Sequence, residues 1–368
     1  MKKKIFTVLA IILLLGLLMP NAVHASGLAI TSSSARMDFP SSLAFNISAQ
    51  SDVNINDIRL HYTVDRMEHA NVISEVYINF TPAKSVTTQY VMDMRRTGGF
   101  PPGSSLTYWW TVTDAGGKEV ETLPERVLIE DGRYNWQSSR QDKVTLYWYS
   151  GDDAFAAELM DATQQALGRL AENSGAELEN PVSIYIYAST ADLQGSMIFP
   201  QEWTGGVAYS QYGIIAIGIA PTSSQMAWGK RAISHELTHL VINQVTFNPY
   251  NALPTWLNEG LAMYSEGGLD VSFASALNAA EENNTLISVR SLSSPFSAYT
   301  AQSILAYAES YEIVAYLINE YGRDKMLELL DTFRQGSGYD EALLKVYGFD
   351  MDGLNLLWKN TTAGMTVH

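Results

Sequence analysis

The spacing of apolar residues changes once along this chain of 368 residues, and that change constrains the fold more than any other feature of the sequence. Before residue 131, apolar and polar residues alternate in short stretches, as in strands with one buried face. In residues 106–112, for instance, Leu106, Tyr108, Trp110 and Val112 share one face. Beyond residue 142, stretches of helical spacing take over. The sequence therefore predicts two domains of different class.

Residues 26–130 are predicted to form an all-β domain. Alternating stretches recur there roughly every ten residues, and Pro101-Pro102-Gly103 and Asp114-Ala115-Gly116-Gly117 supply turns between them. About seven short strands with such turns are typical of a sandwich resembling immunoglobulin or fibronectin modules. No titratable groups cluster in this segment, so adhesion, spacing and substrate presentation all stay open as its role.

Residues 131–142 are polar and are predicted to be a linker, which leaves residues 143–368 as the second domain. Strands are expected at 144–149, at 182–187 and within 207–220, and helical spacing dominates from residue 223 to the end. Gly260, Gly322 and Gly336 are expected near helix ends. A small sheet followed by a bundle of helices predicts an α+β domain.

Residues 1–25 have the pattern of a signal peptide. Three lysines at positions 2–4 precede an uncharged run at 5–19, Pro20 ends the run, and Val23-His24-Ala25 supplies small residues for cleavage. We therefore expect a secreted protein that works outside the cytoplasm; the alternative is a retained N-terminal anchor. Once this signal is cleaved, no remaining apolar run is long enough for stable insertion into a membrane.

Composition excludes several classes of function. The chain carries 23 Lys+Arg against 39 Asp+Glu, a formal net charge of −16, which disfavours binding to nucleic acid or to an anionic membrane surface. With no cysteine, it can form neither a disulfide, nor a thiolate metal site, nor a cysteine nucleophile.

The strongest chemical signal is His235-Glu236-Leu237-Thr238-His239. Two histidines at i and i+4 on a helix point the same way, so both imidazoles can hold one metal ion. Glu236 lies one step round the helix, where its carboxylate can take the proton of a water that the metal activates. Four apolar residues indicate a helix whose buried face is not the face of the histidines: Ile233, Leu237, Leu240 and Val241.

A third ligand is expected at Glu259. Pro254 can start a helix, and the 19 residues between His239 and Glu259 suffice for a turn at 248–251 and an antiparallel return. The neighbours of Glu259 are apolar, so an unpaired carboxylate there would be costly. Catalytic zinc sites use three protein ligands, so we expect one zinc per chain, although two histidines and a carboxylate can also hold other divalent ions.

The motif, followed by Trp256-Leu257-Asn258-Glu259-Gly260, resembles that of the gluzincin metallopeptidases, the thermolysin and aminopeptidase N superfamily. In particular, residues 140–335 are similar to the secreted peptidase MA-like proteins. The resemblance implies a zincin-like metallopeptidase domain acting on a peptide or protein substrate. It also implies zinc held by His235, His239 and Glu259, with Glu236 as general base.

The resemblance implies an oxyanion donor as well. Aminopeptidase N-type enzymes carry a tyrosine 15 residues before a glycine, and Tyr307 has this spacing from Gly322. A phenol beside the metal can donate to the developing negative charge. Tyr311 lies one helical turn further on and is the alternative. Glu266, seven residues after Glu259, is either a carboxylate that orients a ligand or a surface acid.

Two departures bear on specificity. The aminopeptidase N pattern has one residue fewer between the second histidine and the glutamate, and its substrate-lining motif is replaced here by Gly205-Gly206-Val207-Ala208-Tyr209. The glutamate that binds the free α-amino group of the substrate in aminopeptidase N-type enzymes is missing here, and Tyr209 or Ser210 stands near its position. Aminopeptidase specificity therefore does not carry over, and we expect an endopeptidase. The strand edge can still hydrogen-bond an extended peptide.

Two other classes of function remain open. One is an extracellular binding or surface module with an inactive gluzincin domain, although the intact ligands and Glu236 argue against it. The other is a hydrolase of this architecture acting on something other than peptides, which the sequence does not exclude. His61, His69 and His368 are expected to be surface residues and not ligands.

Overall fold

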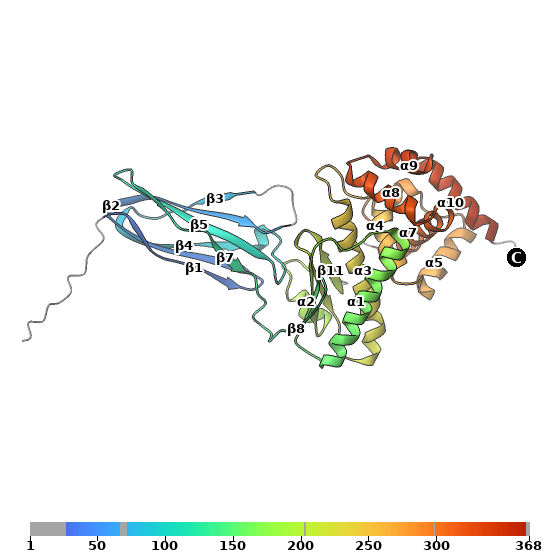
Figure 1. The fold of residues 1–368 in the computed structure, drawn as a ribbon, viewed down its shortest axis with the longest axis horizontal. Helices are drawn as coiled ribbons and strands as arrows, with labels where there is room; N and C mark the ends of the chain where they lie inside the picture. The colour runs from blue at the N-terminus through green and yellow to red at the C-terminus, as the bar shows by residue number, and fades with distance from the viewer. Residues whose placement is uncertain (1–26, 67–71, 202–203, 298, 366–368) are drawn as a thin grey trace, which may run out of the picture.

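A computed structural model describes residues 27–66, 72–201, 204–297 and 299–365 of the chain (Figure 1). The predicted signal peptide, residues 1–25, lies outside the described residues. The first part is built of strands and the last part of helices, as the change in periodicity predicts. Within the described ranges, none of the helices combines the length and the apolar character needed to cross a membrane.

The N-terminal domain contains seven antiparallel strands, whose alternating residues bury one face. Leu106, Tyr108, Trp110 and Val112 are all at most 2 % exposed, as their spacing predicts. The strands are β1 (Ala29–Asp38), β2 (Ser42–Val64), β3 (Ser74–Tyr77), β4 (Ala83–Asp93), β5 (Ser105–Asp114), β6 (Glu119–Glu121) and β7 (Glu125–Leu128), with a 3-10 turn η1 (Met94–Arg96) after β4.

Strand β2 doubles back on itself. A straight strand of its 23 residues would span roughly 75 Å, yet residues flanking both of its ends contact residues beyond the N-terminal domain. Phe39 lies under the guanidinium of Arg133, and Arg66 donates a hydrogen bond to the Tyr212 hydroxyl. The register breaks between Gln50 and Ile55, where β2 exchanges its partners β1 and β4 for β3 and β5. Strand β2 therefore consists of two arms joined at this break.

The second domain contains a five-stranded sheet in the order β11-β12-β10-β9-β8. Its strands are β8 (Gln137–Gln141), β9 (Val144–Trp148), β10 (Val182–Tyr187), β11 (Gly206–Tyr209) and β12 (Ile214–Gly218). The three central strands are parallel, and β8 and β11 form antiparallel edges. β11 therefore has one edge that no other described strand covers.

The segment predicted as a linker, residues 131–142, contributes to this domain. It holds β8, whose five residues are all exposed, so no buried apolar position marks the strand in the sequence. Asp131 is buried and accepts hydrogen bonds from Arg133 and from the Tyr187 hydroxyl. The packed part of the second domain therefore begins before residue 143, while the domain limits themselves stay a prediction.

The sheet is buried on both faces. On β10, Ile184 and Ile186 face the helices, whereas Tyr185 and Tyr187 face an aromatic cluster that includes Trp136. A Cβ atom on Gly103, in a loop of the N-terminal domain, would overlap the Tyr185 hydroxyl. The N-terminal domain therefore rests on the aromatic face of the sheet.

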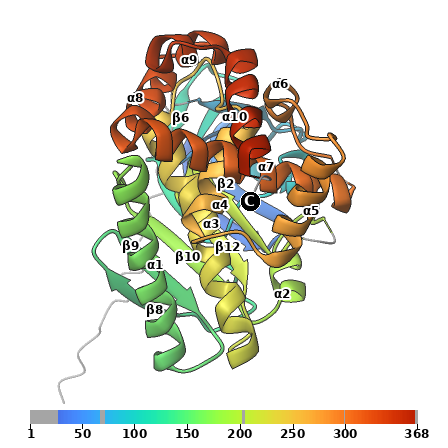
Figure 2. The same cartoon turned by 90° about the vertical axis from the view of Figure 1, so that its right-hand side faces the viewer.

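Helices cover the other face of the sheet (Figure 2). The helices described in this domain are α1 (Asp153–Ser174), α2 (Thr190–Gln194), α3 (Ser223–Thr246), α4 (Thr255–Ser265), α5 (Val271–Glu282), α6 (Val289–Leu292), α7 (Thr300–Tyr321), α8 (Arg323–Arg334), α9 (Tyr339–Tyr347) and α10 (Met351–Met365), with a 3-10 turn η2 (Ser210–Tyr212) between β11 and β12. Of these, α2 lies instead on the aromatic face, where its Leu193 packs in one cluster with Tyr185 and Tyr187. α1 and α3 lie in front of the sheet, and the later helices stack beyond them.

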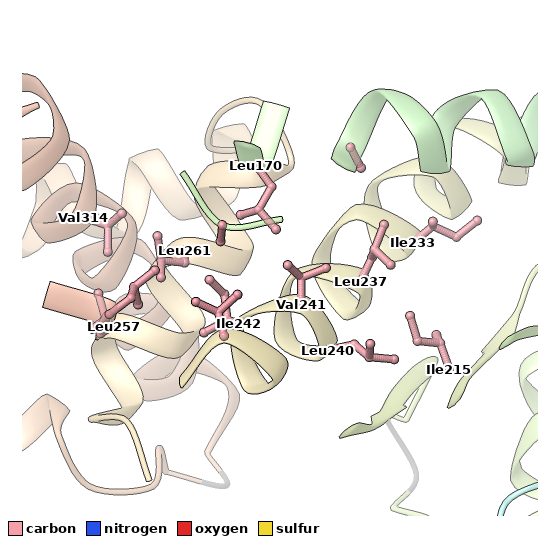
Figure 3. Packing of buried hydrophobic residues seen from close by; sticks show 14 of the residues in the cluster. Leu170, Ile215, Ile233, Leu237, Leu240, Val241, Ile242, Leu257, Leu261 and Val314 are labelled. Carbon is pink, nitrogen blue, oxygen red and sulfur yellow. The ribbon is translucent and has the colours of Figure 1, made fainter. Parts of the chain in front are cut away.

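The core that supports α3 is continuous from the sheet to α7 (Figure 3). Leu240 of α3 points toward Ile215 of β12, and Leu237 is buried in the same cluster. At the other end of the same cluster, Leu257 and Leu261 of α4 meet Val314 of α7. The apolar stripe predicted for 233–241 is thus the buried face of α3.

Gly260 corrects one prediction, because it lies inside α4 and not near a helix end. A Cβ atom at this position would overlap the carbonyl oxygen of Ser310 on α7, so only glycine lets the two helix backbones approach this closely. Gly322 does end α7, and Gly336 follows α8, as predicted. Propensity alone cannot distinguish a glycine needed for packing from one needed for a cap.

We expect Gly260→Ala to destabilise the second domain by about 2 kcal/mol or more, because the methyl group meets backbone that cannot move aside. Gly168→Ala is the matched control. Gly168 lies in the interior of α1 with open space around its Cα, so alanine there should stabilise by about 0.5–1 kcal/mol. Urea unfolding followed by far-UV circular dichroism measures both changes. Equal midpoints for the two variants would contradict the proposed close contact of α4 and α7.

Candidate metal centre

Two helices bring three potential metal ligands together. His235 and His239 lie one turn apart on α3, and α4 carries Glu259 beside them. The Oε2 atom of Glu259 lies 3.4 Å from Nε2 of each histidine. The three ligand atoms all lie within 4.8 Å of one another. The site is thus formed by residues that the sequence places on two different predicted helices.

This arrangement fits a tetrahedral metal ion. Two ligands about 2.0–2.1 Å from one zinc at a tetrahedral angle lie roughly 3.3 Å apart, and both measured N···O distances are 3.4 Å. Glu259 Oε2 is also buried and accepts no hydrogen bond from the residues that the structure describes. A buried carboxylate oxygen without a donor is costly unless a cation satisfies it. Two imidazoles and one carboxylate are the donor set expected for zinc.

A second carboxylate fixes the orientation of His235. Glu266, the residue after α4, places Oε1 2.8 Å from His235 Nδ1 and is itself held by Arg231 through a 2.9 Å ion pair to Oε2. An ionised carboxylate only accepts hydrogen bonds, so Nδ1 carries the proton and Nε2 keeps its lone pair for a metal. Of the two alternatives for Glu266, the structure shows the orienting carboxylate and not a free surface acid.

The charges of the site are mutually stabilising. Burial alone would lower the pKa of His235, but its contacts with the carboxylates of Glu259 and Glu266 raise that pKa to about 10. Burial alone would raise the pKa of Glu259, yet the charge of His239 and the contacts with His235 hold it well below its usual range. A proton and a metal ion therefore compete for the same imidazole nitrogen, so metal binding here releases protons and weakens as the pH falls.

The carboxylate of Glu236 lies close to strand β11. A Cβ atom on Gly206, in β11, would come within 3.0 Å of Glu236 Oε1. The backbone of β11 therefore passes close to this carboxylate, and the absence of a side chain at position 206 leaves room between them.

The structure separates the two candidate tyrosines. The ring of Tyr307 lies 6.4 Å from that of His235 and is held edge-on by Phe296 at 5.1 Å. Tyr311 packs instead against Tyr264, at 5.7 Å. Burial and the nearby carboxylates of Glu259 and Glu236 raise the pKa of Tyr307, so its hydroxyl stays protonated and able to donate at neutral pH. Geometry therefore favours Tyr307 over Tyr311.

Some residues of the site are missing from the sequence-based prediction. Arg231 lies one helical turn before His235, so its position on the same face of α3 could have been predicted from the spacing. By contrast, nothing near Phe296 in the sequence indicates its contact with Tyr307. Among the other histidines, His61 belongs to the N-terminal domain, where its Nε2 lies 2.9 Å from the Thr111 hydroxyl. His69 and His368 lie outside the described residues.

Residues 162–364 match a family model described as the peptidase MA superfamily. No protein in the curated set with which the chain was compared matches it. The match spans more than half of the chain and includes all five predicted site residues: His235, Glu236, His239, Glu259 and Tyr307.

Three solved structures give weaker likenesses. A mutant M1 zinc metallopeptidase from Deinococcus radiodurans is 14 % identical, covering 90 % of this chain and 94 % of its own, with a TM-score of 0.37. An aminopeptidase N family protein from Idiomarina loihiensis is 12 % identical over 86 % of this chain and 73 % of its own, with a TM-score of 0.41. For OgpA from Akkermansia muciniphila, the match is 8 % identical and covers 28 % of this chain and only 27 % of OgpA, with a TM-score of 0.22. Likenesses this low carry no argument about function.

We expect Glu266→Gln to lower the zinc affinity by roughly 10- to 100-fold, because an amide orients His235 less firmly and no longer raises its basicity. Competition with a chromophoric zinc chelator measures the change. Asp270→Asn is the matched control, since Asp270 pairs with the same Arg231 but is exposed and does not touch a histidine. An unchanged affinity in Glu266→Gln would show that Glu266 does not position the ligand.

Proposed function

Because the chain belongs to the peptidase MA superfamily, we propose that it is a zinc-dependent peptidase that cleaves peptides or proteins. The observation that carries this proposal is the convergence of His235, His239 and Glu259 within 4.8 Å. Glu236 lies on the same helix, and its carboxylate lies close to Gly206 of β11, a strand with one uncovered edge among the described strands. A metal site, a neighbouring carboxylate and a strand edge are together what hydrolysis of an extended peptide requires.

Each residue of the chain has a separate task in this reaction. Zinc at the three ligands supplies a Lewis acid that polarises a carbonyl oxygen and acidifies water. Glu236 accepts the proton of the attacking water at a carboxylate oxygen and passes it to the leaving amine nitrogen. Tyr307 donates its hydroxyl proton in a hydrogen bond to the carbonyl oxygen as that oxygen gains charge. Glu266 and Arg231 keep His235 in place.

We further propose an endopeptidase. The residues of β11 and η2, which run from Gly206 to Tyr212, include no acid that could pair with a free α-amino group. The uncovered edge of β11 can hydrogen-bond the backbone of a chain that continues in both directions. Both features support cleavage within a chain over removal of its first residue.

Two finer proposals concern the rest of the chain. The lysines at positions 2–4 and the apolar run at 5–19 support secretion, with the N-terminal segment either cleaved or retained as an anchor. The seven antiparallel strands and the change of partners along β2 support a sandwich of immunoglobulin or fibronectin type for the N-terminal domain.

Glu236→Gln tests the proposed function. We expect it to lower kcat/KM on a peptide substrate by roughly 10²- to 10⁴-fold, because the amide cannot accept a proton. Zinc content, measured by mass spectrometry, should stay equal to that of the parent, because Glu236 is not a ligand. Glu172→Gln, at an exposed position of α1, is the matched control. Cleavage at the parent rate by Glu236→Gln would rule out this carboxylate as the base.

Tyr307→Phe and Tyr311→Phe form a second matched pair. Loss of the Tyr307 hydroxyl should lower kcat by about 10²- to 10³-fold, as removal of one oxyanion donor does in other hydrolases. Tyr311→Phe should keep the parent kcat, because its ring packs against Tyr264 and not against His235. Steady-state kinetics on one fluorogenic peptide separates the two variants, and the opposite ranking would make Tyr311 the donor.

A further inference from the structure

A pocket of about 420 Å³ adjoins the metal centre. It lies between the last turns of α3, the loop at 247–254 and the start of α4, and Ser210 borders it on the side of η2. His239 is part of its wall, as is Asn258, the neighbour of Glu259. A substrate bound at the metal with its backbone along β11 would therefore bring a side chain to the mouth of this pocket.

Apart from the candidate metal ligand His239, the wall of the pocket is built of uncharged residues, in which amides stand beside apolar side chains such as Ile242, Phe247 and Leu253. Among the described residues that line it, none is Asp, Glu, Lys or Arg, and four are asparagines: Asn243, Asn248, Asn251 and Asn258. In a chain with 39 acidic residues, an uncharged pocket beside the metal is a distinct chemical environment. The pocket can form hydrogen bonds with a ligand, but its described lining has no Asp, Glu, Lys or Arg that could pair with a charged ligand.

The asparagines have different tasks. Asn248 shapes the loop: its Nδ2 donates to the carbonyl oxygen of Phe333, and its Oδ1 accepts from the backbone of Tyr250 and Asn251. By contrast, the side-chain amides of Asn243 and Asn258 make no hydrogen bond with the described part of the chain, and both residues are partly exposed to the pocket. A partly enclosed amide without a protein partner is available to a ligand.

We propose that this pocket selects substrates with an uncharged amide side chain, glutamine or asparagine, and that Asn243 is a specificity-determining residue. The inference rests on the proposed peptidase function. An amide side chain both donates to and accepts from the amide of Asn243. A lysine or glutamate would lose its hydration without meeting an opposite charge, and a leucine would leave the wall amides unpaired. Each mismatch should cost about 10- to 100-fold in selectivity.

The test compares three peptides that differ at one position, with glutamine, lysine or leucine. The position is first found by scanning glutamine on either side of the scissile bond. We expect the zinc-loaded parent to prefer the glutamine peptide by at least about tenfold in kcat/KM. Asn243→Asp should shift the ratio of lysine to glutamine toward lysine by tenfold or more, because it gives the pocket a negative charge. Asn360→Asp makes the same chemical change at an exposed site on α10 and should keep the parent ratio.

Binding gives a readout independent of turnover. The same peptides compete for the zinc-loaded Glu236→Gln variant, with and without Asn243→Asp, in fluorescence anisotropy. Cleavage by the parent with equal rates on the three peptides, unchanged by Asn243→Asp, would overturn the pocket proposal and leave the peptidase proposal intact. A preference for glutamine in binding, without any cleavage by the parent, would overturn the peptidase proposal and leave the pocket proposal intact. Equal binding of the three peptides would also overturn the pocket proposal.

Discussion

The site depends on the carboxylate of Glu259, which is held in a partly buried position against two imidazoles. A carboxylate in that setting is stable only beside positive charge, which a metal ion held jointly with His235 and His239, each 3.4 Å away, would supply. This requirement fixes the distance between α3 and α4. α3 is in turn anchored on the sheet through Leu237, Leu240 and Ile215, so the position of the metal ligands follows from the core beneath them.

The parts of the site that follow from local spacing were predictable. His235 and His239 lie at i and i+4, and the apolar stripe of the same segment identified the buried face of α3. Glu259 could be expected from its apolar surroundings. The choice between Tyr307 and Tyr311 could not be made in this way, because residues four apart on a helix share a face and only the neighbouring elements distinguish them. Phe296 and Tyr264 provide that distinction, and both lie outside the helix that carries the two tyrosines.

The fold was predictable to a similar extent, and its gaps have physical reasons. Strands with one buried face can be predicted from the alternation of apolar and polar residues. Strand β8 has no buried residue and lies in a polar stretch, so the sequence does not mark it. The close approach that requires Gly260 depends on α7, 50 residues later in the chain, which no local pattern reports. The pocket beside His239 could not be predicted from the sequence for a related reason. Its wall combines η2, α3 and the loop before α4, and a lone asparagine in a sequence is more often a turn residue than a recognition group.

The contact at Gly260 also bears on how the site can move. Glu259 is on α4 and Tyr307 is on α7, and these helices meet backbone to backbone one residue away from the ligand. Tightly packed helices move as one body, since packed interfaces do not deform continuously. Glu259 and Tyr307, the proposed metal ligand and the proposed oxyanion donor, are therefore expected to keep their relative position. Any movement that widens the site would fall to β11, an edge strand of four residues with only one neighbour among the described strands.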